Sequence, residues 1–248
     1  MAEKINALII HKLAERTFVE NLKPFLYFAG LFMALSLLIE LSFGQESDDL
    51  LPNLIGYLLY AKLAVLVHRT VLLNEQGVIY AFKWGWPEII YFLAIIALMI
   101  VGMIGVALVT YLFLLLSPTA SDSGAGLTAL SIVFFIGIFI LAGYYGARIA
   151  LVFPSIAIGQ SFTLPDIWNK TKPYTLTVFW LIILFPILAQ LVPAVIYFLP
   201  LPEWLLIALI LAMYAVIVIY CITLLSHCYH EIMGEPTNEQ EPIQELTR

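Results

Sequence analysis

The residues best suited to chemistry are gathered in one polar stretch, "ARIALVFPSIAIGQSFTLPDIWNKTKPY" (residues 147–174), between two long apolar runs. It contains Arg148, Trp168, Lys170 and Lys172. Cations beside an indole ring suit the binding of an anion such as a lipid phosphate at a membrane surface. The acids and nucleophiles that catalysis would need are not assembled there, so the stretch favours binding over catalysis.

Recognisable cofactor and metal motifs are absent from the sequence. Cys221 and Cys228 are seven residues apart on one predicted helix, about 10 Å along its axis, which is too far for a disulfide between them. His227 and His230 lack the ligand spacing of a zinc site. No phosphate-binding loop, dinucleotide glycine motif or hydrolase signature occurs at a suitable turn. We expect no metal, no cofactor, no enzymatic activity and no nucleic-acid partner.

Composition indicates the class of the protein that must position these residues. The chain is 62% hydrophobic and 11% charged, with a mean hydropathy of +1.00, too apolar to cover a water-soluble globule of 248 residues. A bilayer core about 30 Å thick needs roughly 20 apolar residues of helix to cross it. The long continuous apolar runs exclude a barrel, whose strands would alternate. We predict an all-α polytopic membrane bundle.

Six transmembrane helices are predicted, within a domain at residues 21–232. They run over about 24–43, 51–69, 87–117, 127–152, 174–200 and 203–229. Residues 1–20 are expected to form an amphipathic helix at the interface, with Ile5, Leu8, Ile9 and Leu13 on its apolar face. Residues 233–248 read as a disordered acidic tail. Ala142 and Gly146, four residues apart, suggest close helix packing.

The distribution of Lys and Arg predicts the orientation. Of the eleven such residues only Lys62 lies well inside a predicted span, whereas Arg69 and Arg148 lie near the ends of theirs, and the connections around 44–50, 118–126 and 201–202 contain none. Because positive residues are retained on the cytoplasmic side, both termini are expected there, in a bacterial inner membrane. Arg69, Lys83 and Trp84 would then flank one cytoplasmic connection, as Arg148, Trp168, Lys170 and Lys172 flank another.

Two polar residues within the spans are candidates for a membrane site. Lys62 is expected to snorkel toward the inner boundary along its own stem, and a functional role is the alternative. Gln190 lies between Pro186 and Pro193, which predicts a kinked fifth helix. A transport path at Lys62 and Gln190 would use both residues.

A recurring pattern links the cytoplasmic connections. Each outward helix begins with a proline, at Pro24, Pro87 or Pro173, preceded by an aromatic residue and at least one lysine. This predicts three pseudo-repeated helix pairs joined by elbows, with short interfacial helices and an aromatic-basic rim. In residues 147–174, hereafter the 147–174 elbow, Thr163 is expected to cap such a helix, with Asp166 in its first turn.

The same stretches carry a family resemblance. The 147–174 elbow resembles a connection in bacterial proteins related to the glycerophosphodiesterase membrane domain and in YciC-type inner-membrane proteins. Its matching residues are Arg148, Pro154, Trp168, Thr171 and Lys172. "VHRTVLLNE" is similar to the His-Arg-x-x-Leu-Leu-x-Glu of poorly characterised relatives, and the resemblance covers residues 20–233. The phosphodiesterase barrel of some relatives has no counterpart in these 248 residues, so the resemblance implies no enzymatic activity.

Three functions remain after these observations. The first is a non-enzymatic membrane protein whose rim binds anionic lipids, a membrane-protein partner or a second copy of itself. The alternative is a small-solute transporter or channel with a site near Lys62 and Gln190. A lipid-modifying enzyme comes third, because Glu75, Glu88 and Asp166 form no recognisable acid–base set with the histidines.

Overall fold

The computed structural model describes residues 6–43, 50–75, 82–116, 124–160 and 163–234. Every regular element in these ranges is a helix. The predicted acidic tail, from residue 235 onward, and most of the connections at 44–50 and 118–126 lie outside the described residues. The all-α class is therefore confirmed.

The helices agree with the predicted spans to within a few residues. They are α1 (Ala7–Glu20), α2 (Leu22–Phe43), α3 (Leu50–Leu73), α5 (Trp86–Leu116), α6 (Gly124–Ile149), α7 (Val152–Ile158), α8 (Leu164–Thr171), α9 (Thr175–Phe179), α10 (Phe185–Ala189), α11 (Leu191–Ile196) and α12 (Glu203–Met233). Five described segments are long and apolar enough to cross a membrane. A sixth span is added if α1 and α2, bent by 76° at their junction, count as one.

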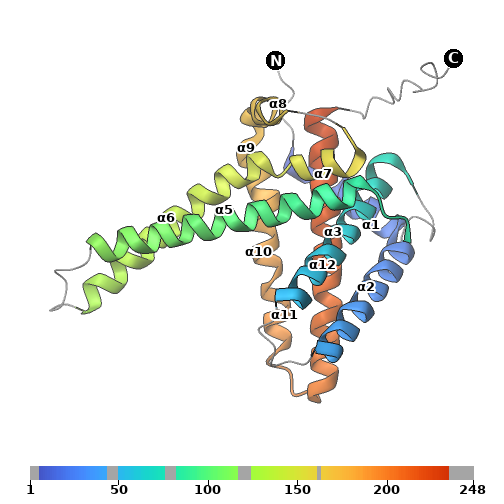
Figure 1. The fold of residues 1–248 in the computed structure, drawn as a ribbon, viewed down its shortest axis with the longest axis horizontal. Coiled ribbons are helices and arrows are strands. Elements are labelled where there is room, and N and C mark those ends of the chain that lie inside the picture. Colours follow the sequence, from blue (N-terminus) through green and yellow to red (C-terminus); the bar gives the residue numbers. More distant parts are fainter. Residues whose placement is uncertain (1–5, 44–49, 76–81, 117–123, 161–162, 235–248) are drawn as a thin grey trace.

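Helix α3 occupies the centre of the molecule, packed against α2, α5, α7 and α12 (Figure 1). Its residues from Ala61 to His68 are all buried, so neighbours cover every side of this part of the helix. The main core cluster joins them to Phe25 and Phe28 of α2 and to Ile219 of α12. Side chains that face inward from this stretch of α3 must therefore find their partners within the protein.

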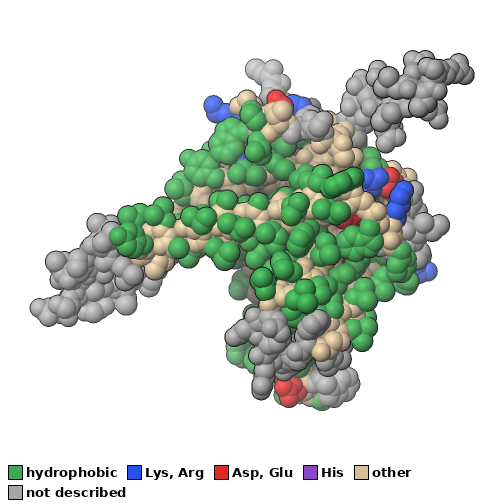
Figure 2. Space-filling view, viewed as in Figure 1, with side chains coloured by type: hydrophobic (Ala, Val, Ile, Leu, Met, Phe, Trp, Pro, Cys, Tyr) green, Lys and Arg blue, Asp and Glu red, His purple; other side chains and the backbone are tan. Residues whose placement is uncertain are grey.

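Helices α5 and α6 extend together away from the other helices (Figure 1). Along this arm large apolar side chains are exposed, including Val101 at 66% and Ile104 at 63%. The arm is covered by hydrophobic side chains in Figure 2, where the visible Lys and Arg side chains lie along the upper and right-hand margins. A surface this apolar requires lipid or protein around it rather than water.

The fifth span is irregular, as its prolines predicted. A π-helical turn at Trp180–Leu184 comes directly before Pro186, and the helix is interrupted again at Gln190, between α10 and α11. Proline lacks the N–H that would continue the helical ladder, so regular bonding fails around it. The irregularity that the prolines predicted is present at these two interruptions, and the kink itself stays a prediction.

Short helices fill the 147–174 elbow. Helix α7 ends at Gly159, whose φ of 72° is the left-handed conformation that glycine adopts at no steric cost. The next helix, α8, is capped by Thr163, whose backbone N–H donates a hydrogen bond to the carboxylate of Asp166. The predicted cap and first turn are confirmed.

Helix α1 packs against α12 through the face that carries Ile10 and Ala14. Ile10 and Ala14 are buried in a cluster with Leu224 and Cys228 of α12, and Tyr220 hydrogen-bonds to His11 at 3.0 Å. The side chains that the sequence pattern favoured for the membrane face, Leu8 and Ile9, stay more than half exposed. They are free to enter a bilayer surface, and the interfacial position stays a prediction.

Close packing occurs at a different residue from the one the sequence suggested. Ala142 is exposed, and a Cβ added to Gly146 would meet nothing within 4 Å. At Gly143 an added Cβ would lie 2.7 Å from Cε2 of the buried Phe179. The prediction for Ala142 and Gly146 is therefore wrong, because the face of α6 that meets α9 runs through Gly143.

Alanine substitution should separate these two glycines. Both changes favour the helical backbone by up to about 1 kcal/mol, but Gly143→Ala also overpacks the contact with Phe179, at a cost of about 1–3 kcal/mol. We expect Gly146→Ala to unfold in detergent at a higher temperature than the wild type. Gly143→Ala should unfold at a lower temperature than Gly146→Ala. Equal midpoints would contradict the close approach at Gly143.

Candidate functional site

Lys62 forms a buried ion pair with Glu88. Its Nζ lies 2.6 Å from Oε1 of Glu88, and the side chains are 2% and 7% exposed. Lys62 also donates to the backbone carbonyl of Lys83, while Oε2 of Glu88 accepts the N–H of Gly85 at 2.9 Å. The predicted snorkelling of Lys62 is wrong, because the amine meets a carboxylate inside the protein.

A polar pocket of about 210 Å³ adjoins this pair; we call it the α3–α5 pocket. It is lined by Lys62, Val65, Leu66, Arg69, Glu75, Lys83, Trp84, Gly85, Pro87 and Glu88. The Nζ of Lys62 lies 5.5 Å from the ring centroid of Trp84, within cation–π range. Lys83 and Trp84 are both exposed, so they form the outer part of the pocket.

Arg69 is neutralised by Glu75. Its Nε and Nη2 donate to the two carboxylate oxygens at 2.7 and 2.6 Å, a bidentate pair, and Nη1 donates to the carbonyl of Ala157 in α7 at 3.1 Å. Asn74, with a φ of 54°, turns the chain after α3 so that Glu75 faces back toward Arg69. Arg69 thus holds the 147–174 elbow against the end of α3.

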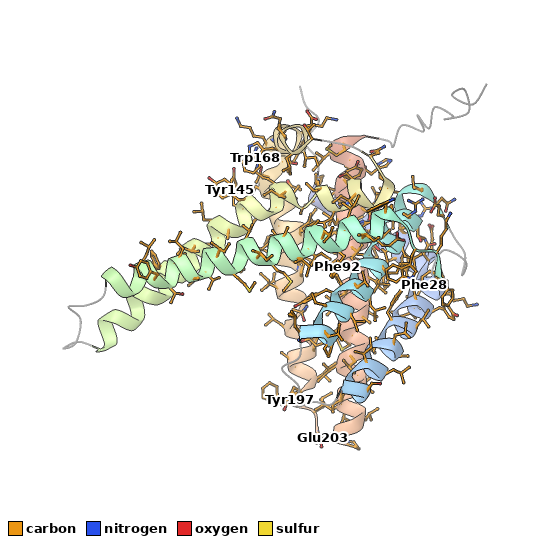
Figure 3. The ribbon with its side chains drawn as sticks, in the orientation of Figure 1. Phe28, Phe92, Tyr145, Trp168, Tyr197 and Glu203 are labelled. Atoms are coloured by element: carbon orange, nitrogen blue, oxygen red, sulfur yellow. The ribbon has the colours of Figure 1, made fainter. Side chains whose placement is uncertain are left out.

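Arg148 is buried without a carboxylate. Its guanidinium carbon lies 3.6 Å from the ring centroid of Trp168, and Nη2 donates to the Trp168 carbonyl at 2.7 Å. The Trp168 ring in turn stacks on Tyr145, as Figure 3 shows, with 5.8 Å between centroids. Arg148 is only 6% exposed, its Nε has no hydrogen-bond partner, and no acid pairs with it among the described residues.

The two lysines of the elbow lie on the surface. Lys170 and Lys172 are exposed at the C-terminal end of α8, within one helical turn of Trp168. Lys170 reaches the carbonyl of Met233 at 3.5 Å, which is long for a hydrogen bond. The structure thus brings Arg148 into contact with Trp168 and places Lys170 and Lys172 within four residues of Trp168 along the chain. It groups Arg69, Lys83 and Trp84 separately, around the α3–α5 pocket.

Lys62 and Gln190 do not form one site. Lys62 contacts Glu88 and Trp84, and Gln190 is not among the residues that line the α3–α5 pocket. Gln190 lies instead at the break in the fifth span, where its Oε1 is buried without a hydrogen-bond partner. The structure therefore does not place Gln190 in the pocket beside Lys62, and a transport path that uses both residues stays a prediction.

Sequence reasoning missed a buried polar group around His68. Its Nδ1 lies 2.7 Å from Oγ of Ser226 and its Nε2 lies 3.3 Å from the hydroxyl of Tyr91. Ser226 also hydrogen-bonds to the carbonyl of Ile222, and all three side chains are buried. This group joins α3, α5 and α12. A histidine in a span beside Arg69 was the signal that would have found it.

Within the described ranges, no group of three His, Cys, Asp or Glu side chains is arranged to hold a metal ion. No protein-family model matches the chain, and comparisons with curated proteins and with solved structures give no match. What the fold and composition define is a class: the protein is an all-α polytopic membrane protein.

The ion pair of Lys62 and Glu88 makes a direct prediction about stability. Glu88→Gln leaves a buried ammonium without its counter-charge, which should lower the free energy of unfolding by about 3–5 kcal/mol. The double variant Lys62→Met with Glu88→Leu removes both charges and should regain most of that loss. Thermal unfolding in detergent measures both changes.

The matched control is the exposed pair of Arg16 and Glu20, with Nε to Oε1 at 2.8 Å. Glu20→Gln should leave the unfolding midpoint unchanged, because solvent screens that pair. If Glu88→Gln unfolds at the wild-type midpoint, the pair is not buried as described.

Proposed function

We propose that this protein is a non-enzymatic integral membrane protein that binds anionic lipid headgroups at the 147–174 elbow. Lys170 and Lys172 would contact the phosphate at the surface, and Arg148 would add positive charge from beneath Trp168. We also propose that the chain is related to the bacterial proteins with a glycerophosphodiesterase membrane domain. A partner protein or a second copy of the chain would bind elsewhere on the rim.

The proposal rests on a difference between Arg148 and the other buried cations. Three cations are partly or wholly buried near the rim: Lys62 is met by Glu88, Arg69 is met by Glu75, and Arg148 is met by no acid in the described part of the chain. A buried charge is costly unless it is paired. A bound anion would give Arg148 the negative partner that Lys62 and Arg69 already have within the protein.

The surroundings of Arg148 suit a lipid phosphate. The two exposed lysines stand within one turn of the carbonyl to which Arg148 donates, and each basic residue near an anionic membrane contributes about 1 kcal/mol. Trp168, stacked on Tyr145, presents the kind of ring that settles at the level of headgroups. Glu203 lies at the opposite end of the molecule from Trp168 (Figure 3).

Orientation and location belong to the same proposal. The basic rim, comprising Arg69, Lys83, Arg148, Lys170 and Lys172, would face the cytoplasm of a bacterial inner membrane, because positive residues are retained on that side. Both ends of the chain would then be cytoplasmic. The close packing of α1 against the last turns of α12 supports a common side for them.

Transport is the second candidate function, and one observation favours it. A buried ion pair beside a polar pocket, between helices long enough to cross a membrane, is a common feature of solute pathways. Gln190 is not part of that pocket, so the candidate path is narrowed to Lys62 and its neighbours.

Lipid retention tests the proposed function. We expect the variant Lys170→Gln with Lys172→Gln to retain roughly thirtyfold less phosphatidylglycerol than the wild type, since it removes two surface charges worth about 1 kcal/mol each. Native mass spectrometry of the purified protein, with neutral phosphatidylcholine as the competitor lipid, measures the change.

Two exposed lysines elsewhere provide a control of equal charge. Lys12→Gln with Lys23→Gln also removes two positive charges, but from α1 and α2 rather than from the elbow. Its retention of phosphatidylglycerol should stay close to wild type. Equal losses in the two double variants would mean that net charge, and not the 147–174 elbow, selects the lipid.

A further inference from the structure

We infer that the α3–α5 pocket is a second, separate anion site, which takes a small phosphate group. It goes beyond the proposed function because it shares no residue with the elbow residues Arg148, Trp168, Lys170 and Lys172. The phosphate can belong to a free solute or to a lipid headgroup, since both present the same oxygen atoms to the pocket.

The pocket has room for such a group. Its volume of about 210 Å³ is far above the roughly 10–15 Å³ that a single water needs. The amine of Lys62, itself 98% buried from solvent, lies at its inner side, and the exposed Lys83 and Trp84 lie at its outer side. A ligand that enters past Trp84 would therefore approach a buried ammonium group.

The charges of the lining favour an anion. Three cations, Lys62, Arg69 and Lys83, face two carboxylates, Glu75 and Glu88, which leaves a net charge of +1. Every carboxylate oxygen already accepts a hydrogen bond, from Arg69 in the case of Glu75 and from Lys62 and the Gly85 N–H in the case of Glu88. The acids are thus engaged by groups of the protein itself.

Lys83 holds the surplus charge. Within the described part of the chain its amine makes no ion pair or hydrogen bond, whereas its backbone carbonyl accepts from Lys62. The pocket also borders the N-terminal turn of α5, at Pro87 and Glu88, where the helix dipole favours negative charge. Both contributions act in the same direction, toward a bound anion.

Stability alone does not account for this arrangement. A buried ion pair gains little over apolar residues of similar size, so the pair of Lys62 and Glu88 is weakly explained as a structural device. Charged groups inside a membrane protein commonly mark a binding site or pathway. The pair of Lys62 and Glu88 lies on the wall of a pocket that carries surplus positive charge, so a role in binding an anion explains why the pair is there.

Titration with phosphate tests the inference. The purified full-length protein in phosphatidylcholine nanodiscs is titrated with inorganic phosphate at constant ionic strength, and binding is followed by calorimetry. We expect Lys83→Gln to weaken binding about tenfold, because one charge-assisted contact is lost while the backbone carbonyl used by Lys62 is kept. Lys23→Gln, which removes an exposed lysine outside the pocket, should bind phosphate as the wild type does.

A second arm identifies the source of the phosphate. Nanodiscs that contain phosphatidic acid, without free phosphate, are compared by lipid retention in the wild type and in Lys83→Gln. Sensitivity to Lys83→Gln in the first arm supports a free solute, and sensitivity in the second arm alone supports a lipid headgroup. If Lys83→Gln changes neither arm, the inference is overturned.

The variant Lys170→Gln with Lys172→Gln separates the two proposals. It should leave the calorimetric affinity for inorganic phosphate unchanged, since neither lysine lines the pocket. If this variant loses phosphate binding and Lys83→Gln does not, the pocket proposal fails while the elbow proposal stands. If this variant retains phosphatidylglycerol as the wild type does while Lys83→Gln loses phosphate binding, the elbow proposal fails and the pocket proposal stands.

Discussion

The pairing of buried charge is the constraint on which the inner part of this structure depends. Lys62 lies in the buried stretch of α3 and its side chain is only 2% exposed, so its ammonium group needs a partner from the protein. Its carboxylate comes from the first turn of α5, so the start of α5 must lie against α3. That contact fixes the 82–85 segment, whose backbone supplies further partners to both charges. The α3–α5 pocket is the space left beside these groups.

The same requirement organises the rest of the rim. Arg69 reaches one carboxylate and one carbonyl of α7, and the group of His68, Ser226 and Tyr91 joins three helices through buried hydrogen bonds. Such polar contacts fix the relative positions of apolar helices that could otherwise slide along one another, because an unpaired buried group is expensive. Arg148 departs from the pattern, since its charge is covered by an aromatic ring and, among the residues that the structure describes, pairs with no acid. This feature of Arg148 is the structural basis of the proposed lipid binding.

Local features of the chain were predictable from sequence, and long-range partners were not. The helical spans follow from apolar length, and the cap at Thr163 follows from its spacing to Asp166, because both depend on neighbouring residues. Lys62 and Glu88 are 26 residues apart on different helices, and depth along a straight helix does not reveal which helices touch. The close contact at Gly143 was misplaced for a related reason, since the facing side of α6 is set by the orientation of α9. Arg148 was singled out by its position in the elbow, and its burial beneath Trp168 could be seen only in the structure.

We propose that a lipid phosphate completes the site formed by Arg148 and its neighbouring lysines. An experimental structure of the protein in nanodiscs containing phosphatidylglycerol would test this proposal. We expect headgroup density within hydrogen-bonding distance of Lys170 and Lys172, above the stacked rings of Trp168 and Tyr145. A structure in which no headgroup lies at the 147–174 elbow, and in which an acidic side chain of the protein itself pairs with Arg148, would contradict it.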